Sequence, residues 1–103
     1  MRIPKVLAYL FWDCDPNSLD PHEHAIFVLD RLMSHTDEHT VAWLRVTYPT
    51  DVLLGYLYNE GTRKLGPCEL EYWCATLDVD ETLRNRWLAA AQARMHRRRA
   101  ASP

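Results

Sequence analysis

The sequence predicts an all-α fold: a compact bundle of about five short helices, preceded by an apolar N-terminal lead-in segment. Two observations lead to this prediction. Apolar residues recur at helical spacing in several segments, and residues that favour helix starts and ends separate those segments. After residue 12, no run of alternating polar and apolar residues is long enough to favour a strand. The connections are short, so neighbouring helices are expected to pack closely.

Size and composition favour a binding module. A chain of 103 residues that is 48% hydrophobic and 25% charged predicts a single domain, residues 1–103, with a modest core. A deep substrate pocket would take up scarce core volume, so we expect a protein that is not an enzyme. No apolar run approaches the roughly 18 residues of a membrane span.

Cysteine usage indicates a reducing compartment. The chain has 3 cysteines, an odd number, and no signal-peptide pattern precedes the predicted domain. Cys68 and Cys74 lie in one predicted helix on different faces, which excludes a disulfide between them. We therefore expect a cytoplasmic protein.

Charge is distributed unevenly along the chain. The formal net charge of -2 combines residues 1–80, which hold 6 Lys/Arg and 13 Asp/Glu, with residues 81–103, which hold 6 Lys/Arg and 1 Asp/Glu. We therefore distinguish an acidic body, residues 12–80, from a basic C-terminal helix and tail, residues 81–103. The acidic body disfavours broad contact with nucleic acid, whereas the basic end suits phosphate or an acidic protein surface.

The chain is organised around the stretch from Leu10 to Met33, LFWDCDPNSLDPHEHAIFVLDRLM. The lead-in segment before it is predicted to be buried, as either a short strand or an apolar helical turn. A turn rich in Asp, Asn, Pro and Ser follows. Asp20 is then expected to cap the first helix, with Pro21 at its first position and Glu23 completing a capping box.

Five helices are predicted from apolar spacing and boundary signals. Their approximate ranges are residues 21–35, 38–47, 51–60, a fourth helix opened by Gly66-Pro67, and 81–98. The other boundary residues are Pro49 and Thr50 between the second and third helices, Asn59 to Gly61 at the end of the third, and Asp80 before the fifth. The expected core residues are Ala25, Leu29, Leu32 and Met33; Val41, Leu44 and Val46; Val52, Leu53, Tyr56 and Leu57; Leu70, Trp73, Cys74 and Leu77; and Leu83, Trp87, Ala91 and Met95.

A zinc site is suggested by His22, His24 and Cys14, because imidazole and thiolate are common zinc ligands. The spacing opposes it, since residues two apart on a helix diverge by about 200°, whereas helical metal pairs use i, i+4. His35 and His39 have that spacing but flank a predicted helix junction. We therefore predict solvated or capping histidines and no metal site.

A carboxylate cluster for Mg²⁺ is suggested by Asp13, Asp15 and Asp20. Asp in a Pro-containing turn more often bonds its own backbone, and Asp20 is already explained by capping. The sequence has no Gly-rich phosphate loop and no nucleophile motif. We predict no catalytic and no cofactor-binding residues, and a small metal-dependent enzyme is the weakest alternative.

Tryptophan and arginine are the candidate partner-binding residues. Large aromatic residues belong to cores by default but are also enriched among interface anchors, and two of the 4 tryptophans lie toward the chain's ends. The arginines that end the last helix have three interpretations: favourable cations at a helix C-terminus, a solvated tail, or a contact with nucleic acid or an acidic protein. The candidates are Trp12, Trp87, Arg94, Arg97, Arg98 and Arg99.

The second and third helices also suggest a helix-turn-helix, in which the third helix would enter the major groove of DNA. Such a helix normally presents several basic or amide side chains. This one presents Asp51, Asn59 and Glu60, and no Lys or Arg precedes Arg63. Its charge argues against DNA.

The stretch LFWDCDPNSLDPHEHAIFVLDRLM, followed by Trp-Leu-Arg-x-x-Tyr at residues 43–48 and Leu-Glu-Tyr-Trp at residues 70–73, resembles a family of small bacterial proteins of unknown function. Its opening signature, LFWD-x-D-x-x-x-L-D, is the most specific part. The resemblance spans about residues 10–78. It departs from the family pattern at Ser34 to Asp37, where a glycine is expected, and the basic last helix lies outside it.

Members of that family are often encoded beside AbiEii-type nucleotidyltransferase toxins. The resemblance therefore implies an antitoxin-like protein that binds and neutralises a toxin of this kind, by blocking its nucleotide or RNA site or by restraining its phosphorylation state. Because the signature is mainly aromatic, Asp and Pro, it is expected to preserve a fold rather than a catalytic site. The alternative is a helix-turn-helix-type DNA-binding transcriptional regulator that uses the third helix or the arginines of the fifth.

Overall fold

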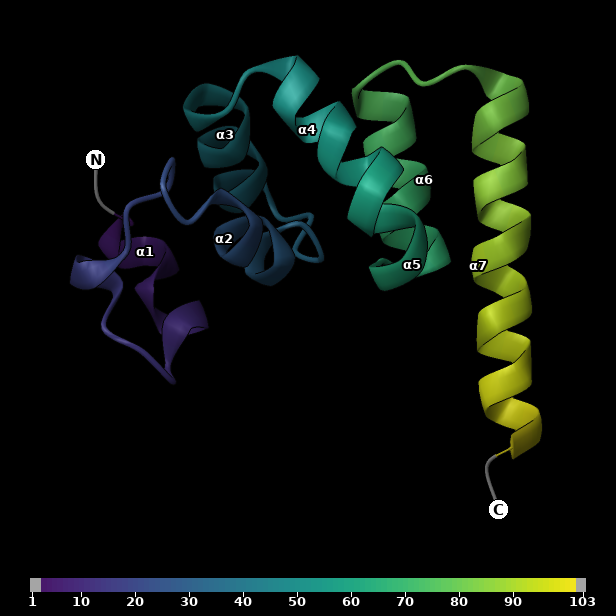
Figure 1. Ribbon diagram of the computed structural model, residues 1–103, viewed down its shortest axis with the longest axis horizontal. Coiled ribbons are helices and arrows are strands. Elements are labelled where there is room, and N and C mark those ends of the chain that lie inside the picture. The colour runs from purple at the N-terminus through teal and green to yellow at the C-terminus, as the bar shows by residue number, and fades with distance from the viewer. Residues whose placement is uncertain (1–2, 102–103) are drawn as a thin grey trace. The chain divides into compact units, whose positions relative to one another are not determined.

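A computed structural model describes the backbone of residues 3–101 and the side chains of residues 3–15 and 17–98. The described backbone contains helices and turns and no strand, which confirms the all-α prediction (Figure 1). The chain divides into an N-terminal unit, Met1–Pro49, and a C-terminal unit, Thr50–Pro103. The predicted change from acidic to basic charge at residue 81 therefore falls inside the C-terminal unit. Among the described helices, none combines the length and apolarity that crossing a membrane requires.

The lead-in segment is helical rather than extended. Helix α1, Lys5–Ala8, continues directly into the 3₁₀ turn η1, Tyr9–Phe11. Ile3, Leu7 and Phe11 recur at steps of four along it and are buried. The prediction of burial therefore holds for one side of the segment.

Helix α2, Ala25–Leu32, begins later than residue 21 because an irregular hydrogen-bonded turn precedes it. Asp20 does cap this turn, since its Oδ1 accepts hydrogen bonds from the backbone N–H groups of His22 and Glu23 at 2.9 and 3.3 Å. The reciprocal bond expected from Glu23 is made instead by His24, whose Nδ1 accepts from the Asp20 N–H at 3.1 Å. The 3₁₀ turn η2, Pro16–Ser18, lies before it.

Helix α3, Glu38–Thr47, has the predicted bounds. Asp37 caps it, because its carboxylate accepts from the N–H of Thr40 at 3.1 Å and from the buried Thr40 hydroxyl at 2.8 Å. Val46 was expected in the core and is 85% exposed, because the inward face is made by Thr40, Val41, Leu44 and Thr47. At 3.6 residues per turn, residue 46 lies on a different side of the helix from these buried residues.

Tyr48 ties the end of α3 to the turn before α2. Its hydroxyl donates to the carbonyl of Pro21 at 2.7 Å, and its ring meets the rings of Trp43 and His22 edge-on. Burial raises the pKa of Tyr48 to about 12. The phenol is therefore a fixed donor in the core of the N-terminal unit.

The first helix of the C-terminal unit is longer than predicted. Helix α4, Thr50–Tyr56, continues through a π turn η3, Leu57–Gly61, into α5, Thr62–Lys64. Gly61 was expected to end the helix, but it is buried with helical dihedral angles. A Cβ at residue 61 would lie 2.9 Å from Leu57 Cδ2, so glycine serves here for close packing rather than as a stop signal.

Helices α6, Pro67–Thr76, and α7, Glu81–Ala101, complete the unit and pack on each other. As predicted, Gly66 and Pro67 open α6, and Leu70, Trp73, Cys74 and Leu77 are all buried. Asp78 ends α6 in a left-handed conformation, with φ of 57°. The N–H of Val79 then donates to the carbonyl of Cys74 at 2.9 Å, which closes a Schellman motif.

Asp80 caps α7 as predicted, since its Oδ2 accepts from the N–H groups of Thr82 and Leu83. The expected apolar stripe of α7 is buried at Trp87 and Ala91, whereas Met95 is 43% exposed. The last turns of α7, yellow in Figure 1, continue past the ends of α5 and α6. There is thus less protein for Met95 to pack against.

We predict that Asp37→Ala lowers the free energy of unfolding by about 1 kcal/mol at neutral pH, because α3 loses its N-cap. Hydrogen bonds from Thr40 hold the pKa of Asp37 below its ordinary value. The contribution of Asp37 is therefore complete above about pH 4 and is lost as the pH falls through the lowered pKa. Denaturant titrations at pH 7 and below pH 4 measure both effects.

Glu38→Ala is the matched control, because it removes an exposed carboxylate from the first turn of the same helix. We expect it to change stability by less than about 0.5 kcal/mol. An equal loss in the two variants would contradict the capping role of Asp37.

Candidate interaction surface

Arg31 of α2 anchors the lead-in segment. Its guanidinium donates to the carbonyl of Leu10 at 2.9 Å and to both carboxylate oxygens of Asp13 at 2.7 and 3.0 Å. It also lies over the rings of Phe11 and Phe27, 5.6 and 5.2 Å from their centroids. The Arg31 side chain thus makes polar contacts with the end of η1 and the turn after it, and aromatic contacts with η1 and α2.

The Arg31 guanidinium beside Asp13 holds the pKa of that carboxyl below its ordinary value. Asp13 therefore remains charged at neutral pH, and the bidentate geometry fixes its direction. The predicted turn role holds for Asp15, whose Oδ1 accepts from the N–H of Asn17 at 2.9 Å, but Asp13 serves a contact distant in sequence.

The other side of the lead-in segment is apolar and exposed. Val6, Tyr9 and Trp12 follow one another at steps of three, and their exposed fractions are 56%, 68% and 84%. We call these three residues the outer face. The opposite side is formed by the buried residues Ile3, Leu7 and Phe11, so this short helical segment is apolar on both sides.

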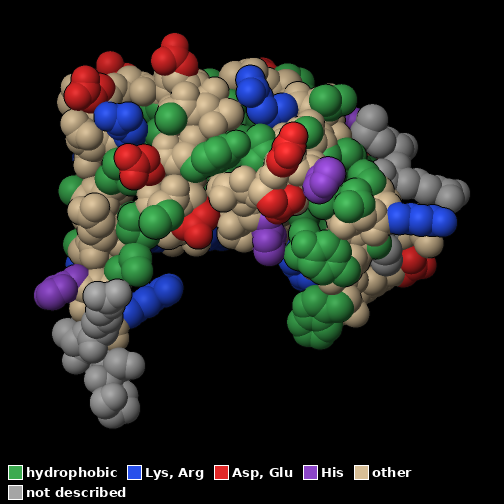
Figure 2. Space-filling model, turned by 180° about the vertical axis from the view of Figure 1, so that it is seen from behind, with side chains coloured by type: hydrophobic (Ala, Val, Ile, Leu, Met, Phe, Trp, Pro, Cys, Tyr) green, Lys and Arg blue, Asp and Glu red, His purple; other side chains and the backbone are tan. Residues whose placement is uncertain are grey.

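Exposed apolar side chains also occur on α2 beside η1. The ring of Phe27 is 41% exposed and lies 6.3 Å from the ring of Phe11, and its neighbour Ile26 is 53% exposed. Figure 2 shows hydrophobic side chains protruding from the N-terminal unit, at the lower right of that view. The N-terminal unit therefore presents a larger apolar surface than its own core uses.

Of the two candidate tryptophans, the structure exposes one and buries the other. Trp12 is 84% exposed, whereas Trp87 is 9% exposed and belongs to the core of the C-terminal unit. The ring of Tyr58, in the π turn, meets the Trp87 ring edge-on at 4.9 Å. The expectation that part of the Trp87 ring stays exposed is wrong, because the Trp87 ring is buried and Tyr58 of the π turn packs against it.

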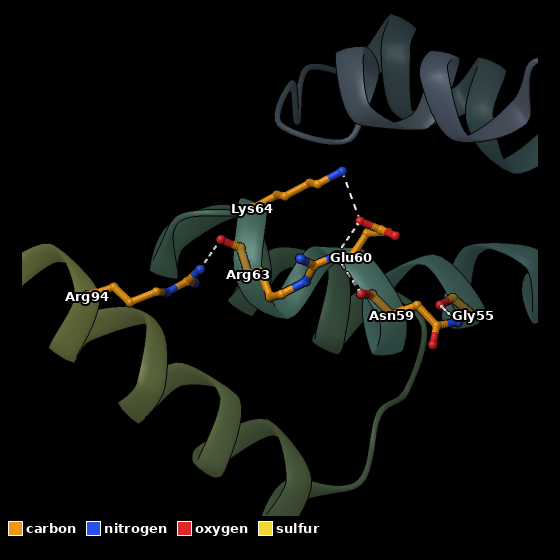
Figure 3. A network of polar contacts seen from close by, with 6 residues as sticks. All are labelled: Gly55, Asn59, Glu60, Arg63, Lys64 and Arg94. Carbon is orange, nitrogen blue, oxygen red and sulfur yellow. Dashed lines mark hydrogen bonds and ion pairs between the residues drawn. The ribbon is translucent and has the colours of Figure 1, made fainter.

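The candidate arginines of α7 differ in their surroundings. Arg94 donates to the carbonyl of Arg63 (Figure 3) and to that of Leu65, the second at 3.2 Å, and so completes the C-terminal end of α5. Arg97 and Arg98 are exposed, and the described residues provide them with no hydrogen-bond or ion-pair partner. The side chain of Arg99 lies outside the described residues.

The histidines and carboxylates are used locally. His24 accepts from the Asp20 backbone, and His22 packs against Tyr48. Within the part of the chain that is described, no group of three or more His, Cys, Asp or Glu side chains is placed to hold a metal ion. Cys68 is exposed and Cys74 is buried, in accord with the different faces predicted for them.

Arg31, Tyr9 and Val6 are the residues that the sequence did not single out. Arg31 carries no local signal in the sequence, because its partner Asp13 is 18 residues away and no local pattern joins the two. Spacing of three in Val6, Tyr9 and Trp12 was available as a signal, but the same residues also fit a buried strand.

Every signature side chain except Trp12 has a place in the fold. Phe11 is buried, Asp13 binds Arg31, Asp15 and Asp20 hold turns, and the leucines are half-buried at positions 10 and 19. Trp12 packs against little of its own chain. Its exposure is what the local structure leaves unexplained.

We predict that Arg31→Lys loosens the lead-in segment, because lysine keeps the charge but loses the fork that reaches Leu10 and Asp13 together. Amide hydrogen exchange of residues 7–11 should accelerate on the order of tenfold, as for one lost charge-assisted hydrogen bond. Arg45→Lys, an exposed site on α3, is the control. Equal exchange rates in both variants would refute the anchoring role.

Comparison with known proteins finds a similarity over the same segment. Residues 6–54 match the model of a family of unknown function (DUF6922). The matched range includes the opening signature, Arg31 and α3, and it covers a little under half of the chain. No curated protein and no solved structure matches. Over residues 6–54, therefore, the chain is similar to a family whose function is unknown.

Proposed function

We propose that this chain is an antitoxin-like, non-enzymatic protein that binds and neutralises a nucleotidyltransferase toxin. The observation that carries the proposal is the outer face, and above all Trp12. An apolar segment with both sides apolar is expected to be covered on both sides, and α2 covers only one. A protein partner that covers the other side would bury exposed Trp and Tyr side chains, the residue types that are enriched at interface hot spots.

The surface itself favours a protein partner over a nucleic acid. Between Lys5 and Asp13 the segment has no charged residue, and its exposed side chains are aromatic or aliphatic. Nucleic-acid interfaces are strongly cationic, whereas the centre of a protein interface is depleted of charge and rich in Trp and Tyr. The outer face has the second composition.

The class of partner follows from the resemblance of the opening signature to proteins encoded beside AbiEii-type toxins. In the mechanism we propose, the outer face docks on the toxin and blocks its nucleotide or RNA site, or restrains its phosphorylation state. The chain contributes shape and apolar contact and no chemistry of its own. Arg31 acts as a positioning residue, since it fixes the segment that presents Trp12.

DNA binding through α4 is the weaker alternative. The exposed side chains of the helix formed by α4 and η3 include Asp51, Val52 and Asn59, and no cation precedes Arg63. No position there offers the paired basic contacts by which a recognition helix is held on phosphates. Sequence-specific, salt-sensitive retention of upstream DNA would favour this alternative over the toxin.

The test is coexpression with the nucleotidyltransferase encoded beside the gene. The intact chain should relieve growth arrest and co-elute with the toxin on size exclusion. Trp12→Ala should raise the Kd roughly thirtyfold, the effect of losing a hot spot worth about 2 kcal/mol, while thermal stability stays unchanged because the ring is exposed.

Val46→Ala is the matched control, because Val46 is equally exposed in the same unit but lies on α3. It should leave both the Kd and the rescue of growth unaltered. Persistent growth arrest without a complex, or the absence of a neighbouring nucleotidyltransferase gene, would overturn the proposal.

A further inference from the structure

Helix α7 leaves one long side uncovered. It lies at the edge of the C-terminal unit and packs on α5 and α6, and no other helix of that unit lies against the side away from them (Figure 1). Trp87 and Ala91, about one turn apart, are buried on the packed side. At about 100° per residue, the opposite side is formed by residues that are exposed in the structure. These residues, which we call the uncovered side of α7, are Asn85, Arg86, Ala89, Ala90, Gln92, Ala93, His96 and Arg97.

The uncovered side is cationic and carries no acid. Arg86 and Arg97 lie within about 20° of each other around the helix. Residues 82–98 contain no Asp or Glu, and neither arginine has a hydrogen-bond or ion-pair partner within the described part of the chain. A cation near a helix C-terminus is favourable, which explains Arg97, but Arg86 lies in the second turn of α7. The unpaired charge of Arg86 is therefore not explained by its own helix.

The side chains between the two arginines are amides and small apolar groups. Asn85 and Gln92 are exposed amides, and alanines fill most of the remaining positions. In the major groove of DNA, Arg pairs with guanine, Asn and Gln pair with adenine, and small apolar side chains such as Ala contact the methyl group of thymine. The uncovered side thus has the basic and amide side chains that a recognition helix presents and that α4 lacks.

We propose that α7 lies in the major groove of double-stranded DNA, with its uncovered side toward the base edges. The groove admits an α-helix, and alanines at the centre of the facing side let the helix approach closely. At 1.5 Å per residue, Arg86 and Arg97 are separated by about 16 Å along α7, whereas the groove is about 12 Å wide. Their guanidinium groups therefore reach the phosphates on both borders of the groove. This contact goes beyond the proposed toxin contact and does not depend on it, because the outer face belongs to the other unit.

Other partners fit the uncovered side less well. The centre of a protein interface is rich in large aromatic anchors, and the uncovered side has no apolar residue larger than alanine. A membrane surface binds a helix through a broad face of large apolar side chains, which is missing for the same reason. Double-stranded RNA has a major groove that is too narrow for side chains to read. B-form DNA is the partner that this composition favours.

Fluorescence anisotropy of the full chain with a labelled DNA duplex of about 20 base pairs, or two helical turns, measures the contact. At low salt the chain should bind this duplex at least about fivefold more tightly than an RNA duplex of the same sequence. Arg86→Gln and Arg97→Gln should each weaken binding about fivefold and reduce the slope of log Kd against log salt concentration by about one, as for one lost phosphate contact. Arg45→Gln removes an exposed cation from α3 instead and should change the Kd less than about twofold.

A neutral variant separates insertion into the groove from diffuse attraction. Ala93→Leu adds bulk in the middle of the uncovered side, leaves the charge unchanged and keeps a good helix former. It should weaken DNA binding about tenfold, the order of a lost base contact, with thermal stability unchanged. Ala42→Leu, at an exposed alanine of α3, is the matched control and should leave the Kd unaltered.

Binding that the three α7 variants weaken and both controls spare supports α7 as the DNA-binding element. Losses in the arginine variants together with full binding by Ala93→Leu would mean diffuse attraction to cations and overturn the groove contact. Absence of binding to the DNA duplex at low salt would also overturn the proposal. Equal affinity for the RNA duplex, or for a polyglutamate peptide, would do the same.

Discussion

The N-terminal unit depends on the position of Arg31. A segment of seven residues in α1 and η1 is too short to be a stable helix by itself, and its own hydrogen bonds fix few of its dihedral angles against chain entropy. The fork of Arg31 joins the Leu10 carbonyl to Asp13, and its planar face covers two aromatic rings. The buried side of the segment is thereby held against α2. The same contact determines which side chains remain outside, so the exposure of Trp12 follows from an interaction that Trp12 does not make.

Division into two units limits what each core can bury. A unit of about 50 residues has a high ratio of surface to volume, so part of its apolar content must stay at the surface. In the C-terminal unit, the glycine at position 61 and the π turn bring Leu57 and Leu65 close together, and Tyr58 covers Trp87. In the N-terminal unit, the excess gathers on the outer face. That difference makes the N-terminal unit the better candidate for a protein partner.

Local signals predicted most of the fold. Asp37 and Asp80 cap helices because a carboxylate satisfies free N–H groups within three residues, and the stripe from Leu70 to Leu77 repeats within one helix. The failures concern contacts that sequence spacing does not encode. Arg31 finds its partner 18 residues away, Gly61 packs inside a helix, and the ring of Trp87 is covered by a distant turn. The candidate site was predicted only in part. Trp12 was identified from the sequence, but its exposure depends on the contacts of Arg31, which sequence spacing does not reveal.

The outer face and the basic residues of α7 lie on different units. In the proposed function, the outer face acts through apolar burial, which the ionic strength of the solution changes little. Its apolar side chains favour a partner whose surface is complementary in shape. The basic residues of α7 attract anions through charge, and added salt screens that attraction. Residues 81–103 hold six arginines against one acid, and the outer face holds no charged residue. The two units therefore suit different kinds of contact, because apolar burial and charge attraction select different groups on a partner.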